Sequence, residues 1–316
     1  MVATSIRVSL FLTAASTLGF AFQSGGPIAP RLLTKDAIPP VDLRVDVPLV
    51  LIPVHVTTPL GSSVTDLTSD RFQLFEDGVR QKITHFASED APISIGMLFD
   101  ASGSMRNKIR KSSEAAAAFF KTANADDEFF LIEFNERPKL AVPFTRDSDE
   151  VYKHMLRTRP IGRTSLLDAI HMALIQMKTA KNLRKAIVIF SDGGDNRSRY
   201  TEGEIKSAMR EADVQVYAMG IFDPDDMPRK TPEERNGPKL LDELAEETGG
   251  RHYPVKDLDD LPAVCAQIGA ELRYQYLLGY APSNSDEDSE YRHVKVLVPA
   301  PLRVHHRTGY SAAGSR

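Results

Sequence analysis

The sequence lacks several features on which common protein functions depend. It has one cysteine, Cys265, among 316 residues, so no internal disulfide is possible. Cys265 stands in an amphipathic helical pattern, which predicts a small buried side chain. Basic residues are not in excess, because 39 Lys and Arg stand against 43 Asp and Glu, for a formal net charge of -4. This balance provides no electrostatic footprint for nucleic acid.

Familiar catalytic and ligand-binding motifs are also absent. The 8 histidines contain no H-E-x-x-H spacing, and no G-x-x-x-x-G-K-[ST] loop occurs. The acidic run from Asn284 to Glu290 lacks the spaced D-x-[DN]-x-[DN]-G of a calcium loop and favours a solvated turn. No Ser-His-Asp or Cys-His set can be assembled. The sequence therefore predicts no catalytic residues.

The N-terminal segment has the character of an export signal. Residues 1–23 carry Arg7 near the start, an apolar core, and small residues at Gly19 and Ala21, which predicts a secretory signal peptide. The alternative is an uncleaved membrane anchor, although hydroxyl residues interrupt the apolar run. Residues 24–40 are rich in Gly and Pro and predict a flexible linker. The signal-peptide interpretation and the anchor interpretation both predict an exported protein that is periplasmic, on the cell surface or secreted.

Strand-forming patterns flank the central part of the chain. Residues 41–90 alternate apolar and polar side chains, which indicates strands. Pro48 and Pro53 should place the first strand at a sheet edge or break it. Asp77-Gly78 joins two alternating runs between Arg71 and Phe86, a strong hairpin signal. Because residues 273–312 return to strand patterns, we expect them to pack with residues 41–90 as one small β module.

The central residues 91–272 alternate between strands and helices. Strands are expected at 128–134, 185–190 and 214–221, with helices at 109–122, 202–211 and 240–247. Residues 223–238 are polar and rich in Pro, which predicts a loop. The alternation predicts an α/β fold, a doubly wound, mostly parallel sheet with helices on both faces.

The candidate site begins in the stretch from Ile93 to Met105. An apolar run ends at Asp100, and Ser102 and Ser104 follow in a short loop. In an open α/β sheet, ligands bind beyond the carboxyl ends of the strands. Oxygen ligands on one loop suit a hard cation such as Mg²⁺.

Two later loops repeat this arrangement. Thr164 precedes a predicted helix, and the strand 185–190 leads into Asp192. Taken singly, each of these residues has a structural alternative as a helix cap or turn residue. Asp168, Asp195 and Asn196 lie near these loops, but we expect helix or turn roles for them and leave them outside the site.

Together, Asp100-x-Ser102-x-Ser104, Thr164 and Asp192 resemble, in order and context, the metal-ion-dependent adhesion site of von Willebrand factor type A (VWA) domains. The resemblance covers roughly 91–272. More weakly, the pieces L-F-E-D-G, Y-L-L-G-Y and R-T-G-Y resemble exported bacterial VWA-related proteins with β segments on both sides of the domain.

The resemblance implies a VWA/Rossmann-like fold and a bound Mg²⁺, with Mn²⁺ possible. It implies that Ser102, Ser104 and Thr164 are direct ligands, and that Asp100 and Asp192 act largely through coordinated water. An Asp or Glu of a partner protein would fill the open position of the metal.

These observations leave two classes of function. The first is an exported binding module that captures an acidic side chain of a partner through Mg²⁺, without enzymatic activity. The alternative is an exported Mg²⁺-dependent hydrolase or phosphoryl-transfer enzyme with Asp100 as a nucleophile, although no second Asp stands two residues later. A scaffold that never binds metal is a third interpretation. Membrane association is expected only if the N-terminal segment is uncleaved.

Overall fold

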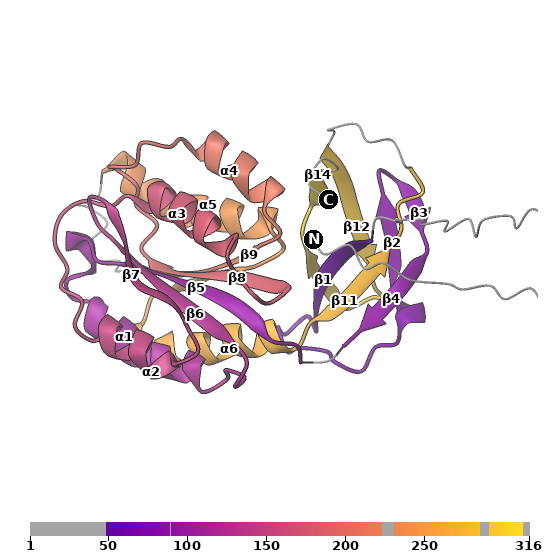
Figure 1. Ribbon diagram of the computed structural model, residues 1–316, viewed down its shortest axis with the longest axis horizontal. Helices are drawn as coiled ribbons and strands as arrows, with labels where there is room; N and C mark the ends of the chain where they lie inside the picture. Colours follow the sequence, from indigo (N-terminus) through magenta and orange to yellow (C-terminus); the bar gives the residue numbers. More distant parts are fainter. Residues whose placement is uncertain (1–48, 89, 223–230, 285–290, 312–316) are drawn as a thin grey trace, which may run out of the picture.

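The computed structural model describes residues 49–88, 90–222, 231–284 and 291–311. A larger α/β domain and a smaller β module lie side by side (Figure 1). The expected signal peptide, the linker and residues 41–48 lie outside the described residues. None of the helices in the described ranges has the length and apolar character that a membrane span requires.

The α/β domain contains a six-stranded sheet in the order β10-β9-β8-β5-β6-β7. All neighbouring strands run parallel except β7, which pairs antiparallel with β6 at the edge. Every residue of the central strand β5 is buried, as expected for a strand covered on both faces. The strands are β5 (Ile93–Asp100), β6 (Glu128–Phe134), β7 (Pro138–Thr145), β8 (Arg184–Ser191), β9 (Gln215–Ile221) and β10 (His252–Val255).

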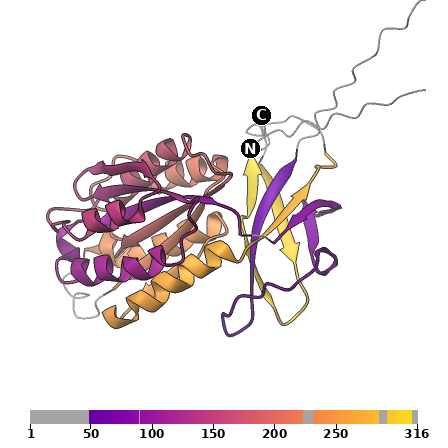
Figure 2. The same ribbon diagram turned by 60° about the horizontal axis from the view of Figure 1, so that its bottom comes forward.

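Helices cover both faces of this sheet (Figures 1 and 2). One face packs against α1 (Ile109–Phe120), α2 (Ser148–Met155) and α6 (Leu261–Arg273). The other packs against α3 (Leu166–Met177), α4 (Glu202–Glu211) and α5 (Pro232–Glu247). The predicted doubly wound α/β fold is therefore confirmed. Cys265 is buried on α6, as predicted, and burial raises the pKa of its thiol to about 12.

The predicted loop over 223–238 is wrong in its second half. Helix α5 begins at Pro232 and contains Pro238, while 223–230 lie outside the described residues. Proline suits the first turn of a helix, where its missing N–H is not needed. Pro238 is unfavourable by about 3 kcal/mol, but Leu240, Leu241 and Leu244 of the same helix are buried against the sheet. Their burial outweighs that cost.

The β module consists of two four-stranded antiparallel sheets, each built from both ends of the chain. One has the order β13-β1-β11-β4 and the other β14-β12-β2-β3, with a shared apolar core. The early strands are β1 (Val50–Thr57), β2 (Gln73–Glu76), β3 (Val79–Gln81) and β4 (Ile83–Ala87), and the late strands are β11 (Tyr276–Tyr280), β12 (Tyr291–Leu297), β13 (Arg303–His306) and β14 (Gly309–Ser311).

Two local predictions in this module have opposite outcomes. Asp77 and Gly78 connect β2 to β3 with φ values of 47 and 81°, so the predicted primed turn is present. The prediction that Pro53 marks an edge or a break is wrong, because β1 lies inside its sheet. Strand β13 pairs only with Val54–Thr57. Pro53 therefore has a strand neighbour on one side alone, where its missing N–H is tolerated.

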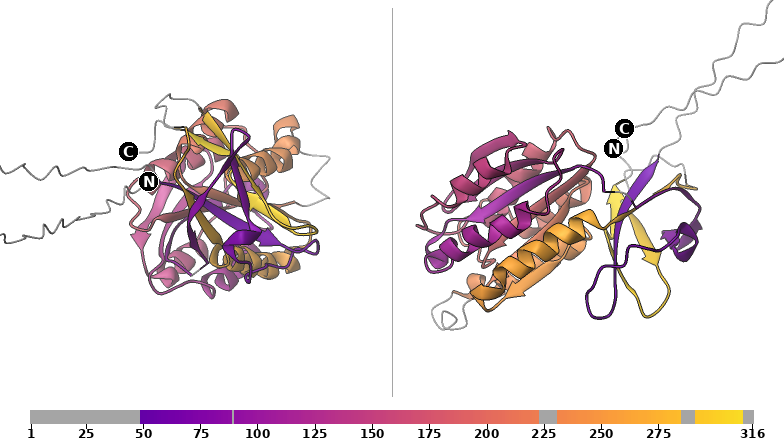
Figure 3. Two further views of the ribbon diagram at one scale, coloured as in Figure 1. Left: turned by 90° about the vertical axis from the view of Figure 1, so that its right-hand side faces the viewer. Right: turned by 90° about the horizontal axis from the view of Figure 1, so that it is seen from below.

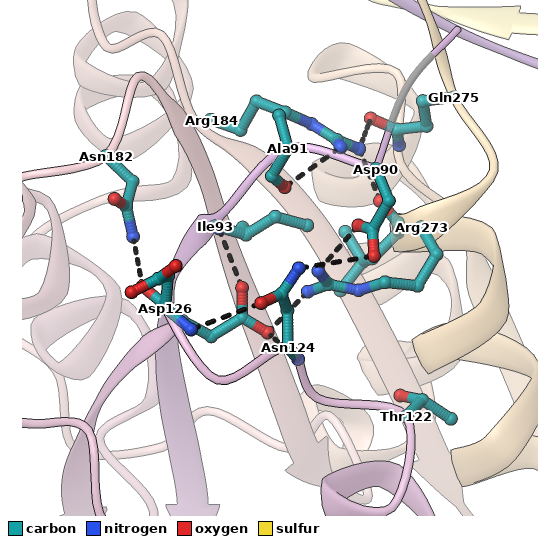
Figure 4. A network of polar contacts seen from close by, with 12 residues as sticks. Asp90, Ala91, Ile93, Thr122, Asn124, Asp126, Asn182, Arg184, Arg273 and Gln275 are labelled. Atoms are coloured by element: carbon teal, nitrogen blue, oxygen red, sulfur yellow. Dashed lines mark hydrogen bonds and ion pairs between the residues drawn. The ribbon is translucent and has the colours of Figure 1, made fainter.

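The chain passes between the two units after β4 and again after α6, and polar contacts of Asp90 and Arg273 tie these two crossings together (Figure 4). Arg273 donates to Asp90 Oδ1 at 2.9 Å and to Asp127 Oδ2 at 2.6 Å. Asp127 also accepts from the backbone N–H of Ile93, the first residue of β5, at 2.8 Å. Asp100 is the last residue of β5. The β module therefore joins the α/β domain at the amino ends of the central strands, and the predicted metal loops lie at the opposite, carboxyl ends (Figure 3).

Candidate metal centre

Asp100 lies at the carboxyl end of β5 and is completely buried. Its Oδ1 accepts a hydrogen bond from the backbone N–H of Ser102 at 2.8 Å. Its Oδ2 accepts from the Ser191 hydroxyl at 2.6 Å. These two contacts fix the orientation of the carboxylate. Sequence analysis did not assign Ser191 to the site, although the residue ends β8, directly before Asp192.

The hydroxyls of Ser102 and Ser104 lie side by side in the loop after β5. Their Oγ atoms are 3.0 Å apart. Neighbouring ligands of an octahedral Mg²⁺ with metal–oxygen distances of about 2.1 Å lie about 3.0 Å apart. Met105 is buried and anchors this loop in the core. The spacing of the two hydroxyls therefore fits adjacent ligand positions of Mg²⁺.

Backbone contacts bring the Thr164 loop to the same edge. The Gly103 N–H donates to the Gly162 carbonyl at 2.9 Å. Thr164, only 3% exposed, donates its N–H to Asn196 Oδ1 at 3.1 Å. The Asn196 N–H donates in return to the Thr164 carbonyl at 3.1 Å. The three loops of the predicted site thus form one hydrogen-bonded assembly.

Asp192 is also buried and lies beside a lysine that sequence analysis missed. Lys108 Nζ is 3.6 Å from Asp192 Oδ2, and both side chains are 1% exposed. Lys108 stands in the polar stretch R-N-K-I-R, which has the appearance of a solvated helix start. Only the tertiary structure reveals that this side chain turns inward. Its ammonium balances part of the carboxylate charge.

The electrostatics of the site favour a cation. Burial, followed by the charge of Asp192, raises the pKa of Asp100 to about 7. Mutual repulsion between buried carboxylates is the situation that a bound divalent ion relieves. Among the described residues no group of three or more His, Cys, Asp or Glu could hold a metal. The candidate set differs from such groups because three of its five members are hydroxyls, and this hard-oxygen composition suits Mg²⁺.

Asp168 and Asp195 brace these loops. Asp195 Oδ2 accepts from the backbone N–H of Leu167 at 2.8 Å, near the start of α3. Asp168 Oδ1 accepts from the N–H of Arg199 at 2.8 Å. Both carboxylates therefore use backbone donors in the way that cap and turn residues do.

Comparison with known proteins finds a family match within the central segment. Residues 96–194 match the family model of the von Willebrand factor type A domain, a range that includes all five candidate residues. A curated relative is an uncharacterized protein of Borreliella burgdorferi, 24% identical over 199 residues. The match covers 56% of this chain and 57% of that protein, so the chain spans little more than half of the relative's length.

Several solved structures are similar to this chain at low sequence identity. The von Willebrand factor type A protein from Catenulispora acidiphila has a TM-score of 0.49 and 12% identity, over 84% of this chain and 74% of that chain. BatB from Bacteroides thetaiotaomicron has a TM-score of 0.45 and 17% identity, over 57% of this chain and 98% of that chain. Likenesses at this level do not extend to function.

Proposed function

We propose that this chain is an exported, divalent-metal-dependent binding module without enzymatic activity. Ser102, Ser104 and Thr164 would hold Mg²⁺ or Mn²⁺ directly, with Asp100 and Asp192 acting through water. The metal would take an Asp or Glu side chain of a partner protein as a further ligand. The match to the VWA model over 96–194 supports an interaction module. The observation that carries the proposal is the pair of serine hydroxyls 3.0 Å apart beside a buried carboxylate.

The chemistry of the donor set explains why a partner carboxylate would be needed. Neutral hydroxyls leave most of the charge on a divalent ion uncompensated. Lys108 already neutralises part of the charge of Asp192 at 3.6 Å, which leaves the ion still less compensated. A carboxylate from outside would complete both the charge balance and the coordination of a hard cation.

Titration calorimetry of Mg²⁺ into the purified protein provides the test. We expect Mg²⁺ binding that Thr164→Ala weakens by about ten-fold or more, since the change removes a ligand oxygen. Thr164 is at the rim of the sheet, so the melting temperature in chelator should stay close to that of the parent. Thr179→Ala is a matched control, because this exposed threonine lies just beyond the far end of α3.

The second half of the test uses an acidic peptide. Binding of a labelled peptide with one glutamate should require Mg²⁺, so it should disappear in chelator and weaken in Thr164→Ala. Equal peptide affinity in all three conditions would contradict the proposed mode of capture. Mg²⁺-dependent turnover of phosphate or carboxylate esters, lost in Thr164→Ala, would instead identify an enzyme.

A further inference from the structure

The loops that surround the candidate metal site carry an unusual concentration of arginine. Four segments meet there: 101–108 after β5, 135–137 between β6 and β7, 156–165 between α2 and α3, and 192–201 between β8 and α4. The exposed basic residues in these segments are all arginines, and Lys108 is buried. Six of the arginines are Arg106, Arg137, Arg157, Arg159, Arg163 and Arg197, and we call these six the arginine rim.

Backbone hydrogen bonds hold the four segments together around the site. The Ala101 N–H donates to the Phe134 carbonyl at 2.8 Å, and the Ile161 N–H donates to the Ala101 carbonyl at 2.8 Å. The first contact adds the end of β6, and with it the turn 135–137, to the assembly of Gly103, Gly162, Thr164 and Asn196. The second contact is a further link between the loop after β5 and the loop after α2. The segments that carry the arginine rim therefore lie together at the end of the sheet where Asp100, Ser102 and Ser104 stand, although they are dispersed over about 90 residues of sequence.

The charge of the rim is not neutralised within the described part of the chain. None of the ion pairs found there involves the six side chains. A seventh exposed arginine, Arg199, contacts Asp168 at 3.3 Å. Glu136 is the exposed acid among the described residues of the four segments, and Glu202 and Glu204 follow at the start of α4. A chain with a formal net charge of -4 thus presents a positive surface at this edge.

We propose that the partner offers a cluster of Asp or Glu residues, of which one reaches the metal and its neighbours pair with the arginine rim. This inference rests on the proposed metal site and specifies the partner that the site recognises. Guanidinium groups pair with carboxylates through two parallel hydrogen bonds. A positive rim also speeds the encounter with an acidic partner.

One exposed apolar residue favours a polypeptide over a sulfated polysaccharide as this partner. Ile161 is 67% exposed, and it stands between Arg159 and Arg163 on the loop beside the metal site. A polysaccharide offers no aliphatic side chain to cover it. An acidic segment of a protein can place an apolar residue on Ile161 while its carboxylates contact the neighbouring guanidinium groups.

The test compares two labelled peptides of equal length by fluorescence anisotropy in Mg²⁺. One contains a single glutamate among glutamines, and the other contains a run of glutamates. The intact protein should bind the second peptide more tightly, and this preference should largely vanish at about 0.5 M salt, where the Debye length is about 4 Å. Each exposed ion pair is worth a factor of about two to five in affinity.

The double variant Arg157→Gln/Arg159→Gln should lose most of this preference, by about five-fold or more. Its Mg²⁺ affinity by calorimetry and its affinity for the single-glutamate peptide should be unchanged. Arg71→Gln/Arg80→Gln removes the same charge from exposed positions in the β module and should behave like the parent.

The outcomes separate this inference from the proposed function. Mg²⁺-dependent binding of both peptides with equal affinity would overturn the acidic-cluster partner and leave the metal-dependent capture standing. Failure of both peptides to bind in a Mg²⁺-dependent way would overturn both. Heparin that binds tightly in chelator, through the rim arginines and regardless of Thr164→Ala, would overturn the inference in favour of a sulfated polyanion.

Discussion

Replacement of Asp100 by asparagine should stabilise the metal-free protein while it weakens metal binding by about ten-fold or more. Burial, with the repulsion of Asp192, raises the pKa of Asp100 from 3.8 to about 7. At about 1.4 kcal/mol per pKa unit, ionised Asp100 costs the fold about 4 kcal/mol. Asparagine carries no charge, and its amide oxygen can still accept the 2.8 Å hydrogen bond from the Ser102 N–H. We expect the free energy of unfolding to rise by about 1–3 kcal/mol. The rise is smaller than the full cost of the charge, because the hydrogen bond with Ser191 must reverse its direction.

The pH dependence of this gain follows from the direction of the shift. Between pH 3.8 and about 7, the unfolded chain has lost the proton of Asp100 while the folded protein still holds it. The free energy of unfolding of the parent therefore falls as pH rises through this window. The asparagine of the variant does not titrate, so the advantage of the variant should be largest above pH 7. At pH 5 it should be less than half as large.

Urea unfolding in chelator at pH 8 and pH 5 measures both values. Mg²⁺ at pH 8 should stabilise the parent by more than it stabilises Asp100→Asn. A variant that is no more stable than the parent at pH 8 would refute the claim that an uncompensated charge is buried at this site. A gain that is equal at both pH values would assign the effect to packing rather than to charge.

Three further predictions concern other buried titratable groups. Lys108→Met should tighten Mg²⁺ binding by about ten-fold in calorimetry, because the ammonium 3.6 Å from Asp192 repels the cation. Weaker binding would instead show that the lysine holds Asp192 in the position that binding needs. Glu76→Ala should lower the free energy of unfolding in urea by about 3–5 kcal/mol, since two buried tyrosine hydroxyls would lose their acceptor and Arg292 would lose its carboxylate partner. Burial lowers the pKa of His55 to about 3, so stability should fall as pH drops below 6.5. His55→Gln should flatten that acid-side slope, and an unchanged slope would show that other groups cause it.

The sequence predicts best those elements whose own residue pattern shows which of their faces are buried. The strand Glu128–Phe134 and the helix Glu202–Glu211 occur with the predicted bounds. One is an apolar run buried on both faces, and the other has a single apolar side and a capping box at Thr201. The position of Asp100 at a strand end followed from the same pattern. For these elements, local chemistry and tertiary packing favour the same structure.

Predictions failed where a distant contact decides the structure. The proline-rich stretch before Leu240 is helical because its leucines find a place against the sheet. Pro53 is tolerated inside a sheet because β13 ends beside it. Lys108 could not be assigned to the site, because a lysine next to other polar residues is normally solvated. That the five candidate residues hold a metal stays a prediction until an ion is titrated.

The pairing of β1 has a consequence for the order in which the chain folds. Both neighbours of this strand, β11 and β13, come from residues 276–306, more than 200 positions later. During synthesis, Val50–Thr57 has no sheet to join until the whole α/β domain has been made, and contacts of such sequence separation are slow to form. The β module should therefore close last. An interrupted translation product would carry a finished α/β domain with an apolar strand exposed to other chains.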